Sequence, residues 1–115
     1  MPLAAYLAKV KTTPQALEFS ALMEVIEGHY AFTPTAFSNG RVVNEAAQNQ
    51  GSCKLFAFAK LNGLSEAQTL ACFGRYYRED VLQNPEGEDH QNIRNFIVHG
   101  WDGIAFEGEA LRVRD

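Results

Sequence analysis

The sequence predicts a mainly α-helical, compact single domain of about five helices, with a small β-hairpin and a short C-terminal extended stretch. A chain of 115 residues is long enough for one hydrophobic core but short for two. Apolar residues recur at three- and four-residue spacing in several segments, which is the pattern of amphipathic helices. One Asn-Gly pair lies between short aromatic and β-branched runs, which is typical of a hairpin turn.

Two helices are predicted near the N-terminus. The first covers residues 2–11 and has one apolar face. Thr13 is a good N-cap and Pro14 suits a first helical position, so a second helix is expected from 14 to about 27, ending at Gly28. Its two adjacent apolar faces predict that it is the centre of the core. They consist of Phe19, Leu22, Met23, Ile26 and Tyr30, and of Leu17, Ala21 and Val25.

A short hairpin is predicted next, with Asn39-Gly40 at its turn. A type I′ turn requires positive φ at both central positions, and both residue types tolerate it. The flanking strands are expected within 30–37 and 41–43, and Pro34 restricts the first of them to an edge or an irregular segment.

The next two helices have clear end signals. Ser52 is expected to cap a third helix over 53–62, which Gly63 ends. The segment Ser65–Gln68 has the pattern of a capping box and starts a fourth helix, expected to reach about Leu82.

A last helix and an extended tail complete the predicted fold. Asp89 is expected to cap a helix over 90–99, which Gly100 ends. Trp101 is expected to pack against this helix, and 104–106 alternates as an extended stretch that pairs with the hairpin. The inward-facing residues of the helix are expected to be Ile93, Phe96 and Ile97.

Composition excludes several classes of protein. Ten basic and fourteen acidic residues give a net charge of −4 and a pI near 5.3, which argues against nucleic acid as a partner. No apolar run is long enough to predict a membrane span, and no secretory signal is apparent. Two cysteines form no disulfide framework and no Cys/His set has zinc spacing, so we expect free thiols, no metal and no cofactor.

Five motifs in order resemble the HopJ, or HopPmaJ-type, type III effector family along nearly the whole chain. They are TPTAFSNG at 33–40, VNEAAQNQGSCKLFAFA at 43–59, LACFGRYYREDVL at 70–82, DHQNIRNF at 89–96 and GWDGIAFEGEAL at 100–111. The resemblance implies one HopJ-like domain over 1–115, small and mainly helical, in a candidate bacterial effector without established catalytic residues. The expected location is the bacterial cytoplasm, with delivery into a host cell if the protein is an effector.

Cys53 is the candidate nucleophile. Within Gly51-Ser52-Cys53-Lys54, a helix start and a neighbouring Lys both lower a thiol pKa. Cys53 is therefore expected to be more reactive than Cys72, with a histidine as its base. The alternative is that Ser52 is only a cap and Cys53 a small buried apolar residue.

The amide-rich segment before this helix is a candidate binding surface. Asn44, Glu45 and Asn49 lie in it, and their side chains can present donors and acceptors to a ligand or a peptide backbone. The alternative is an ordered loop whose side chains satisfy its own backbone.

Two further segments carry candidate binding residues. The turn containing Arg78 is expected to lie near the start of the third helix, where it adds positive charge, and its alternative is a solvated face with weak ion pairs. His90 and Asn92 lie at the start of the last helix, where the alternative is that Asp89 caps the helix and its neighbours are solvated.

Two function classes are therefore predicted. The first is an interaction or ligand-binding module that binds a protein or a small polar ligand, neither nucleic acid nor membrane. The second is a small hydrolase or transferase that depends on Cys53. The predicted binding residues are Asn44, Glu45, Asn49, Ser52, Cys53, Lys54, Arg78, His90 and Asn92.

Overall fold

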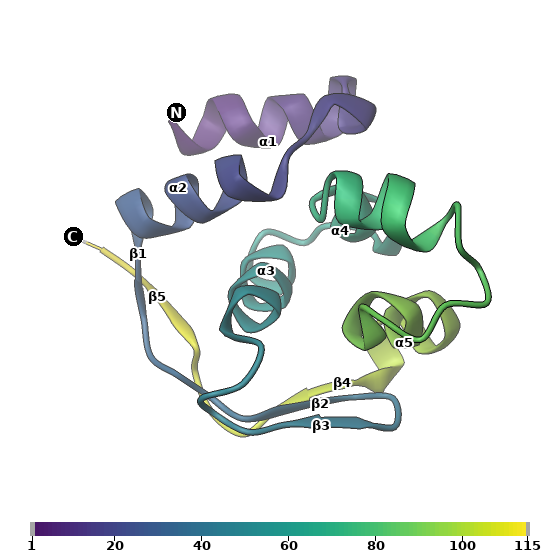
Figure 1. Cartoon of the computed structure of the whole chain (residues 1–115). Helices are drawn as coiled ribbons and strands as arrows, with labels where there is room; N and C mark the ends of the chain where they lie inside the picture. The colour runs from purple at the N-terminus through teal and green to yellow at the C-terminus, as the bar shows by residue number, and fades with distance from the viewer. Residues whose placement is uncertain (1, 115) are drawn as a thin grey trace.

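The computed structural model describes residues 2–114, which form five α-helices, three short helical segments of other types and five short strands (Figure 1). In chain order the elements are α1 Leu3–Thr12, η1 Pro14–Ala16, α2 Phe19–His29, β1 Tyr30–Phe32, β2 Phe37–Asn39, β3 Val42–Asn44, α3 Gln50–Leu61, α4 Glu66–Ala71, η2 Tyr76–Val81, α5 Gln91–His99, η3 Gly100–Gly103, β4 Ile104–Phe106 and β5 Leu111–Val113. The fold is therefore mixed, with helices and two small sheets, where the sequence predicted one hairpin and a tail.

The two sheets are parts of one interrupted ribbon. β1 pairs antiparallel with β5, and β2 pairs antiparallel with β4 in the same register. The backbone N–H of Thr33 still donates to the carbonyl of Ala110, at 2.8 Å. Pro34 has no N–H to donate, which explains why regular pairing stops beside it. The predicted pairing of the tail with the hairpin is confirmed, and it makes β2 the middle strand of the order β3-β2-β4.

The predicted hairpin is confirmed, but its turn is displaced by one residue. Asn39 pairs with Val42, so Gly40 and Arg41 are the two loop residues. Gly40 has φ +60° and is the only one of the two with positive φ. A glycine at the first central position is typical of a type II′ turn, whereas the sequence suggested type I′.

Three predicted helix starts are wrong. α2 begins at Phe19, because Pro14–Ala16 forms a separate 3-10 turn and Thr13 makes no side-chain cap. α2 also continues through Gly28 to His29. α3 begins at Gln50 and not after Ser52, and α5 begins after His90 without a cap from Asp89. The predicted capping box of α4 and the helix ends at Gly63 and Gly100 are confirmed.

The predicted fourth helix is interrupted at Gly74. α4 ends at Ala71, and after a turn the chain continues as the π-helical segment η2. Gly74 has φ +64°, and a Cβ there would lie 3.0 Å from the carbonyl oxygen of Leu17 and from the backbone of Glu18 and Phe19. This close approach of two backbones sets the direction of η2 and the position of Phe19.

The core surrounds α3, which lies in the middle of the molecule (Figure 1). α3 buries six of its twelve residues, whereas α2, the predicted centre, buries three of eleven. Phe56 contacts four aromatic rings and Trp101 packs edge-on against Phe96, as expected for a residue that closes the core. Ile97 is 45% exposed, so its predicted inward orientation is wrong. Within residues 2–114, no helix has the length and apolarity to cross a membrane.

Candidate functional site

One cleft unites residues from separate parts of the chain. It lies between the first turns of α3 and α5 and has a volume of about 390 Å³. We call it the α3–α5 cleft. It contains four of the predicted binding residues, Asn49, Ser52, His90 and Asn92. Its other lining residues are Phe19, Val42, Gly51, Phe73, Tyr76, Gln91 and Ile93.

The α3 wall of the cleft ends in unbonded amides. Asn49 precedes the helix with φ 49° and ψ 44°, a left-handed conformation that Asn tolerates better than most residues. Its side chain donates to Asn44 Oδ1 at 2.7 Å and does not cap the helix. The first backbone bond of the helix is from Cys53 N to Asn49 O, so the N–H groups of Gln50, Gly51 and Ser52 have no acceptor within residues 2–114.

The α5 wall has the same construction. His90 precedes this helix with φ 50°, and it and Asn49 are the only non-glycine residues with positive φ among residues 2–114. The His90 ring turns away from the helix, and its Nε2 lies 3.1 Å from Asp80 Oδ2. The N–H groups of Gln91 and Asn92 have no acceptor in the described chain.

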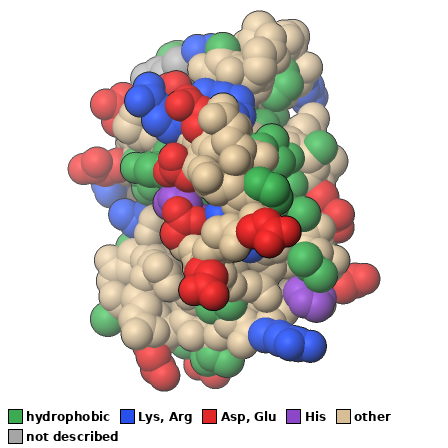
Figure 2. Space-filling model, turned by 45° about the vertical axis from the view of Figure 1, so that its right-hand side comes forward, with side chains coloured by type: hydrophobic (Ala, Val, Ile, Leu, Met, Phe, Trp, Pro, Cys, Tyr) green, Lys and Arg blue, Asp and Glu red, His purple; other side chains and the backbone are tan. Residues whose placement is uncertain are grey.

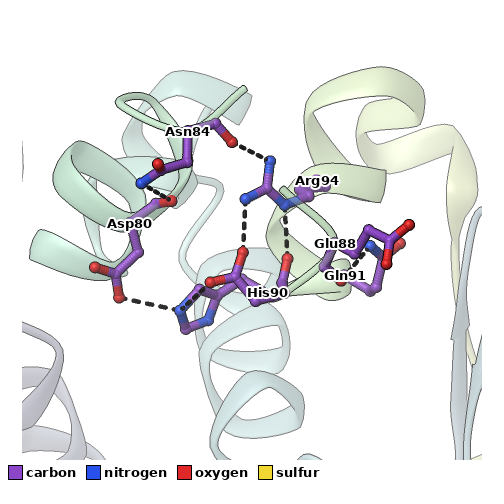
Figure 3. A network of polar contacts seen from close by, with 7 residues as sticks. Asp80, Asn84, Glu88, His90, Gln91 and Arg94 are labelled. Carbon is purple, nitrogen blue, oxygen red and sulfur yellow. Dashed lines mark hydrogen bonds and ion pairs between the residues drawn. The ribbon is translucent and has the colours of Figure 1, made fainter. Parts of the chain in front are cut away.

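Arg94 holds the loop that carries His90 against α5 (Figure 3). Its guanidinium donates to the carboxylate of Asp89 at 2.6 Å, to the Asp89 carbonyl at 2.6 Å and to the Asn84 carbonyl at 2.9 Å. The pKa of Asp89 is lowered, mainly by the hydrogen bond from Arg94. The loop is thus fixed at both ends, which keeps the imidazole at the cleft.

An aromatic wall faces these two helix starts. The ring of Phe19 stacks on Phe73 at 6.1 Å and meets Tyr76 edge-on at 5.6 Å. Tyr76 in turn lies 5.4 Å from the His90 ring. A Cβ at Gly51 would lie 2.9 Å from Cζ of Phe19, so the lack of a side chain at this position lets the ring lie close against α3. The cleft therefore has an apolar, flat side and a side rich in hydrogen-bond donors.

A cluster of four hydrogen-bonded asparagine side chains reaches from the lining of the cleft into the protein, and three of them, Asn39, Asn44 and Asn92, are buried. Asn44 and Asn92 exchange hydrogen bonds through their amides, at 3.0 and 3.2 Å. Asn39 Nδ2 donates to the Asn92 carbonyl at 2.7 Å, and Asn49 joins the cluster through Asn44. Asn44 itself is fully buried, so it supports the predicted surface from beneath and is not part of it.

Besides Asn44, four predicted binding residues lie outside the cleft: Glu45, Cys53, Lys54 and Arg78. Glu45 is exposed, and its N–H donates to the Gln48 side chain. The ammonium group of Lys54 lies 4.8 Å from the centre of the Phe32 ring. Arg78 donates to the Leu17 carbonyl at 2.8 Å and pairs with Glu18. The turn containing Arg78 does lie near the start of α3, since Tyr76 lines the same cleft as Ser52. The predicted free positive charge of Arg78 is wrong, because its guanidinium is paired with Glu18.

Cys53 is also outside the cleft. It is 1% exposed, and its thiol donates to the Thr35 carbonyl at 3.5 Å. Burial raises the pKa of Cys53, and this effect exceeds the opposing influence of the Thr35 carbonyl contact and the Lys54 charge. Cys72 is a free, buried thiol as well, and burial raises its pKa to about 11. The predicted reactive thiolate at Cys53 is wrong, because side-chain burial outweighs the helix start.

We expect neither thiol to react with iodoacetamide in the native protein, because both sulfurs are buried and protonated near neutral pH. After unfolding in urea, both Cys53 and Cys72 should label completely. Peptide mapping of the two samples checks this. Preferential native labelling of Cys53 would show that its side chain is open to solvent.

One face of the molecule carries side chains of both charges. On the face shown in Figure 2, Lys and Arg side chains are scattered among acidic and apolar ones and form no continuous basic patch. Within residues 2–114, His, Cys, Asp and Glu side chains form no group of three that could hold a metal ion.

Sequence reasoning missed the aromatic wall and the support of His90. Phe19 and Phe73 have the pattern of core residues, and the break at Gly74 that turns Tyr76 to the cleft depends on a tertiary contact. Asp80 and Arg94 lie in two of the motifs described above. An acidic and a basic residue in the segments on either side of His90 could have predicted that its loop is held by ion pairs.

Comparison with known proteins gives a consistent result. A search of curated proteins returns no match. The crystal structure of VPA0580, a protein described as of unknown function, is 55% identical, with a TM-score of 0.98; the alignment covers 99% of this chain and 95% of that one. The family model of the HopJ type III effector protein matches residues 3–111. The chain therefore belongs to the HopJ type III effector family.

Proposed function

We propose that this protein is a small ligand-binding module and that the α3–α5 cleft is its binding site. The observation that carries the proposal is the cleft itself, a concave site of about 390 Å³ in which four predicted binding residues from two distant segments meet. Concave sites with an apolar lining and a few converging polar groups are the usual form of a small-molecule site.

The lining indicates the kind of ligand. Phe19, Phe73 and Tyr76 offer flat apolar surface on one side. The unbonded N–H groups at the starts of α3 and α5 are hydrogen-bond donors on the other, and helix starts favour negative charge. A small molecule with a planar apolar part and a carbonyl or carboxylate group matches both sides.

Benzoate is a suitable probe because it has one ring and one carboxylate. In an NMR titration, we expect the amide signals of Gln50–Ser52, Gln91 and Asn92 to shift together, with a Kd on the order of 1–10 mM for so small a ligand. Acetate, which has no ring for the aromatic wall, should bind several times more weakly. Shifts scattered over the surface, or none, would contradict the proposal.

A matched pair of variants separates binding from folding. Ser52→Glu places a carboxylate in the cleft, at the first turn of α3, where negative charge stabilises a helix by about 0.3–1 kcal/mol. It should therefore remove benzoate binding without unfolding the protein. Ala67→Glu adds the same charge to the first turn of α4, outside the cleft, and should leave binding unchanged.

The family description supports a setting for this activity. Because the family is named for type III effectors, we also propose that the ligand is encountered after delivery into a host cell. The Cys53-dependent hydrolase or transferase finds no support, because the thiol is buried and hydrogen-bonded away from the cleft.

A further inference from the structure

We propose that Asn44 is a positioning residue that fixes the two helix starts of the α3–α5 cleft relative to each other. The inference rests on the proposed function, since it concerns how the same site is built. Asn44 lies at the end of β3, in neither helix, and is fully buried. It therefore acts on the cleft only through the side chains that it holds.

Asn44 bonds to both walls at once. Its Oδ1 accepts from Asn49 Nδ2 at 2.7 Å, on the α3 side, and from Asn92 Nδ2 at 3.0 Å, on the α5 side. Its Nδ2 donates to Asn92 Oδ1 at 3.2 Å and to the Phe37 carbonyl at 3.3 Å. Two donors and two acceptor sites are all that an amide has, so every one of them is used.

The hairpin is the frame for this connection. Phe37 and Asn44 pair across β2 and β3, so the Asn44 amide is held to its own sheet by the Phe37 carbonyl. At the other end of β2, Asn39 Nδ2 donates to the backbone carbonyl of Asn92 at 2.7 Å. The first turn of α5 is thus fixed to the hairpin at two points, and α3 is fixed to the same hairpin through Asn49.

The connection also explains the backbone of α3 at the cleft. The side chain of Asn49 is directed to Asn44 and not back over its helix, which leaves the N–H groups of Gln50–Ser52 open to the cleft. A capping side chain would occupy those donors. The hydrogen bond from Asn49 to Asn44 therefore orients the start of α3 and also leaves its first N–H groups available to a ligand.

Asn44→Asp tests the inference because it changes one group of the amide. The Oδ1 acceptor of Asn44 is kept, while the Nδ2 donor is replaced by a carboxyl oxygen. That oxygen faces two other acceptors, the Phe37 carbonyl oxygen and Asn92 Oδ1. Burial raises the pKa of a carboxyl group, so the acid is neutral at lower pH and can still donate, and it becomes charged as the pH rises. No charged side chain hydrogen-bonds to this position within residues 2–114.

For Asn44→Asp, we measure benzoate affinity as a ratio to the wild-type affinity at the same pH. We expect this ratio to fall about fivefold between pH 6 and pH 9, which is the effect of one lost hydrogen bond. Taking the ratio removes any effect of pH that is common to both proteins. Gln15→Glu, the corresponding amide-to-acid change at an exposed position of η1 outside the cleft, should keep a ratio near one. A pH-independent ratio near one for Asn44→Asp would overturn the inference.

Asn49→Gly provides a variant that keeps the fold. Glycine adopts the left-handed conformation of this position readily, so stability should change little, while the bond to Asn44 is lost. Benzoate binding should weaken about fivefold. Wild-type affinity in a folded Asn49→Gly variant would contradict a positioning role.

Hydrogen exchange in the free protein separates this inference from the proposed function. In Asn44→Asp at pH 9, protection of the first bonded amides of α3 and α5, Cys53 and Ile93, should fall at both helices, although the substituted residue is in neither. If wild type binds no benzoate, the proposed function fails and this measurement alone decides the inference. Unchanged protection at either helix would overturn it.

Discussion

Replacing Phe56 by alanine should destabilise the protein by about 3–5 kcal/mol, the range for emptying a buried aromatic site. Phe56 is fully buried in the middle of α3. Its ring contacts four others, those of Phe37, Phe73, Phe96 and Trp101, at centroid distances of 6.0, 5.5, 5.0 and 6.4 Å. These rings come from β2, the turn after α4, α5 and η3, so one substitution weakens the contact of α3 with four parts of the fold.

Urea denaturation followed by circular dichroism measures this effect as a shift of the midpoint. Leu61→Ala is the matched control, because Leu61 lies on the same helix but is 56% exposed. Its effect should stay within about 0.5 kcal/mol, as for most surface substitutions. Equal midpoints for the two variants would mean that α3 is not the centre of the core.

Local sequence signals predicted the elements whose ends depend on nearby residues. The capping box of Ser65 and Gln68 is present, with the Gln68 N–H bonded to the Ser65 hydroxyl at 3.1 Å. Gly63 ends α3 as expected, because the following amide of Leu64 donates back to the Ala59 carbonyl. In these cases the bonds that define the boundary span only a few residues.

Boundaries that depend on distant contacts were not predictable in the same way. The start of α3 is set at Asn49 because its side chain bonds to Asn44, and the sequence favoured Ser52 as a simple cap. With the helix begun earlier, Cys53 already has its amide bonded and its side chain in the core. Charge and residue type at a helix start could not reveal this burial, which removes the expected reactivity of Cys53.

The sequence indicated several residues of the candidate site but not their arrangement, because the arrangement depends on contacts between distant segments. The polar residues Asn49, Ser52, His90 and Asn92 stand out in the sequence because they occupy helix starts. Their meeting in one cleft depends on the packing of α5 against the hairpin. The free positive charge predicted for Arg78 is absent because its guanidinium donates to the Leu17 carbonyl, in the loop before α2. This contact joins residues sixty-one positions apart, so local sequence could not indicate it.

Gly74→Ala should destabilise the protein by about 2–5 kcal/mol. Gly74 has φ +64°, which disfavours any residue with a Cβ by about 1–2 kcal/mol. A methyl group would also lie 3.0 Å from three backbone atoms of Leu17, Glu18 and Phe19, and overpacking of this kind adds about 1–3 kcal/mol. Backbone atoms cannot move aside as a flexible side chain would, so η2 and the start of α2 must separate.

Gly63→Ala isolates the contribution of this close approach. Gly63 also has φ +64°, but nothing lies within 4 Å of the position that a methyl group would take there. Gly63→Ala should therefore show only the conformational penalty of about 1–2 kcal/mol. Urea midpoints of the two variants give the difference directly, and equal destabilisation would show that the backbone contact at Gly74 is unimportant. Because that contact places Phe19 and Tyr76, Gly74→Ala should also weaken benzoate binding in the fraction that remains folded, whereas Gly63→Ala, at the far end of α3, should not.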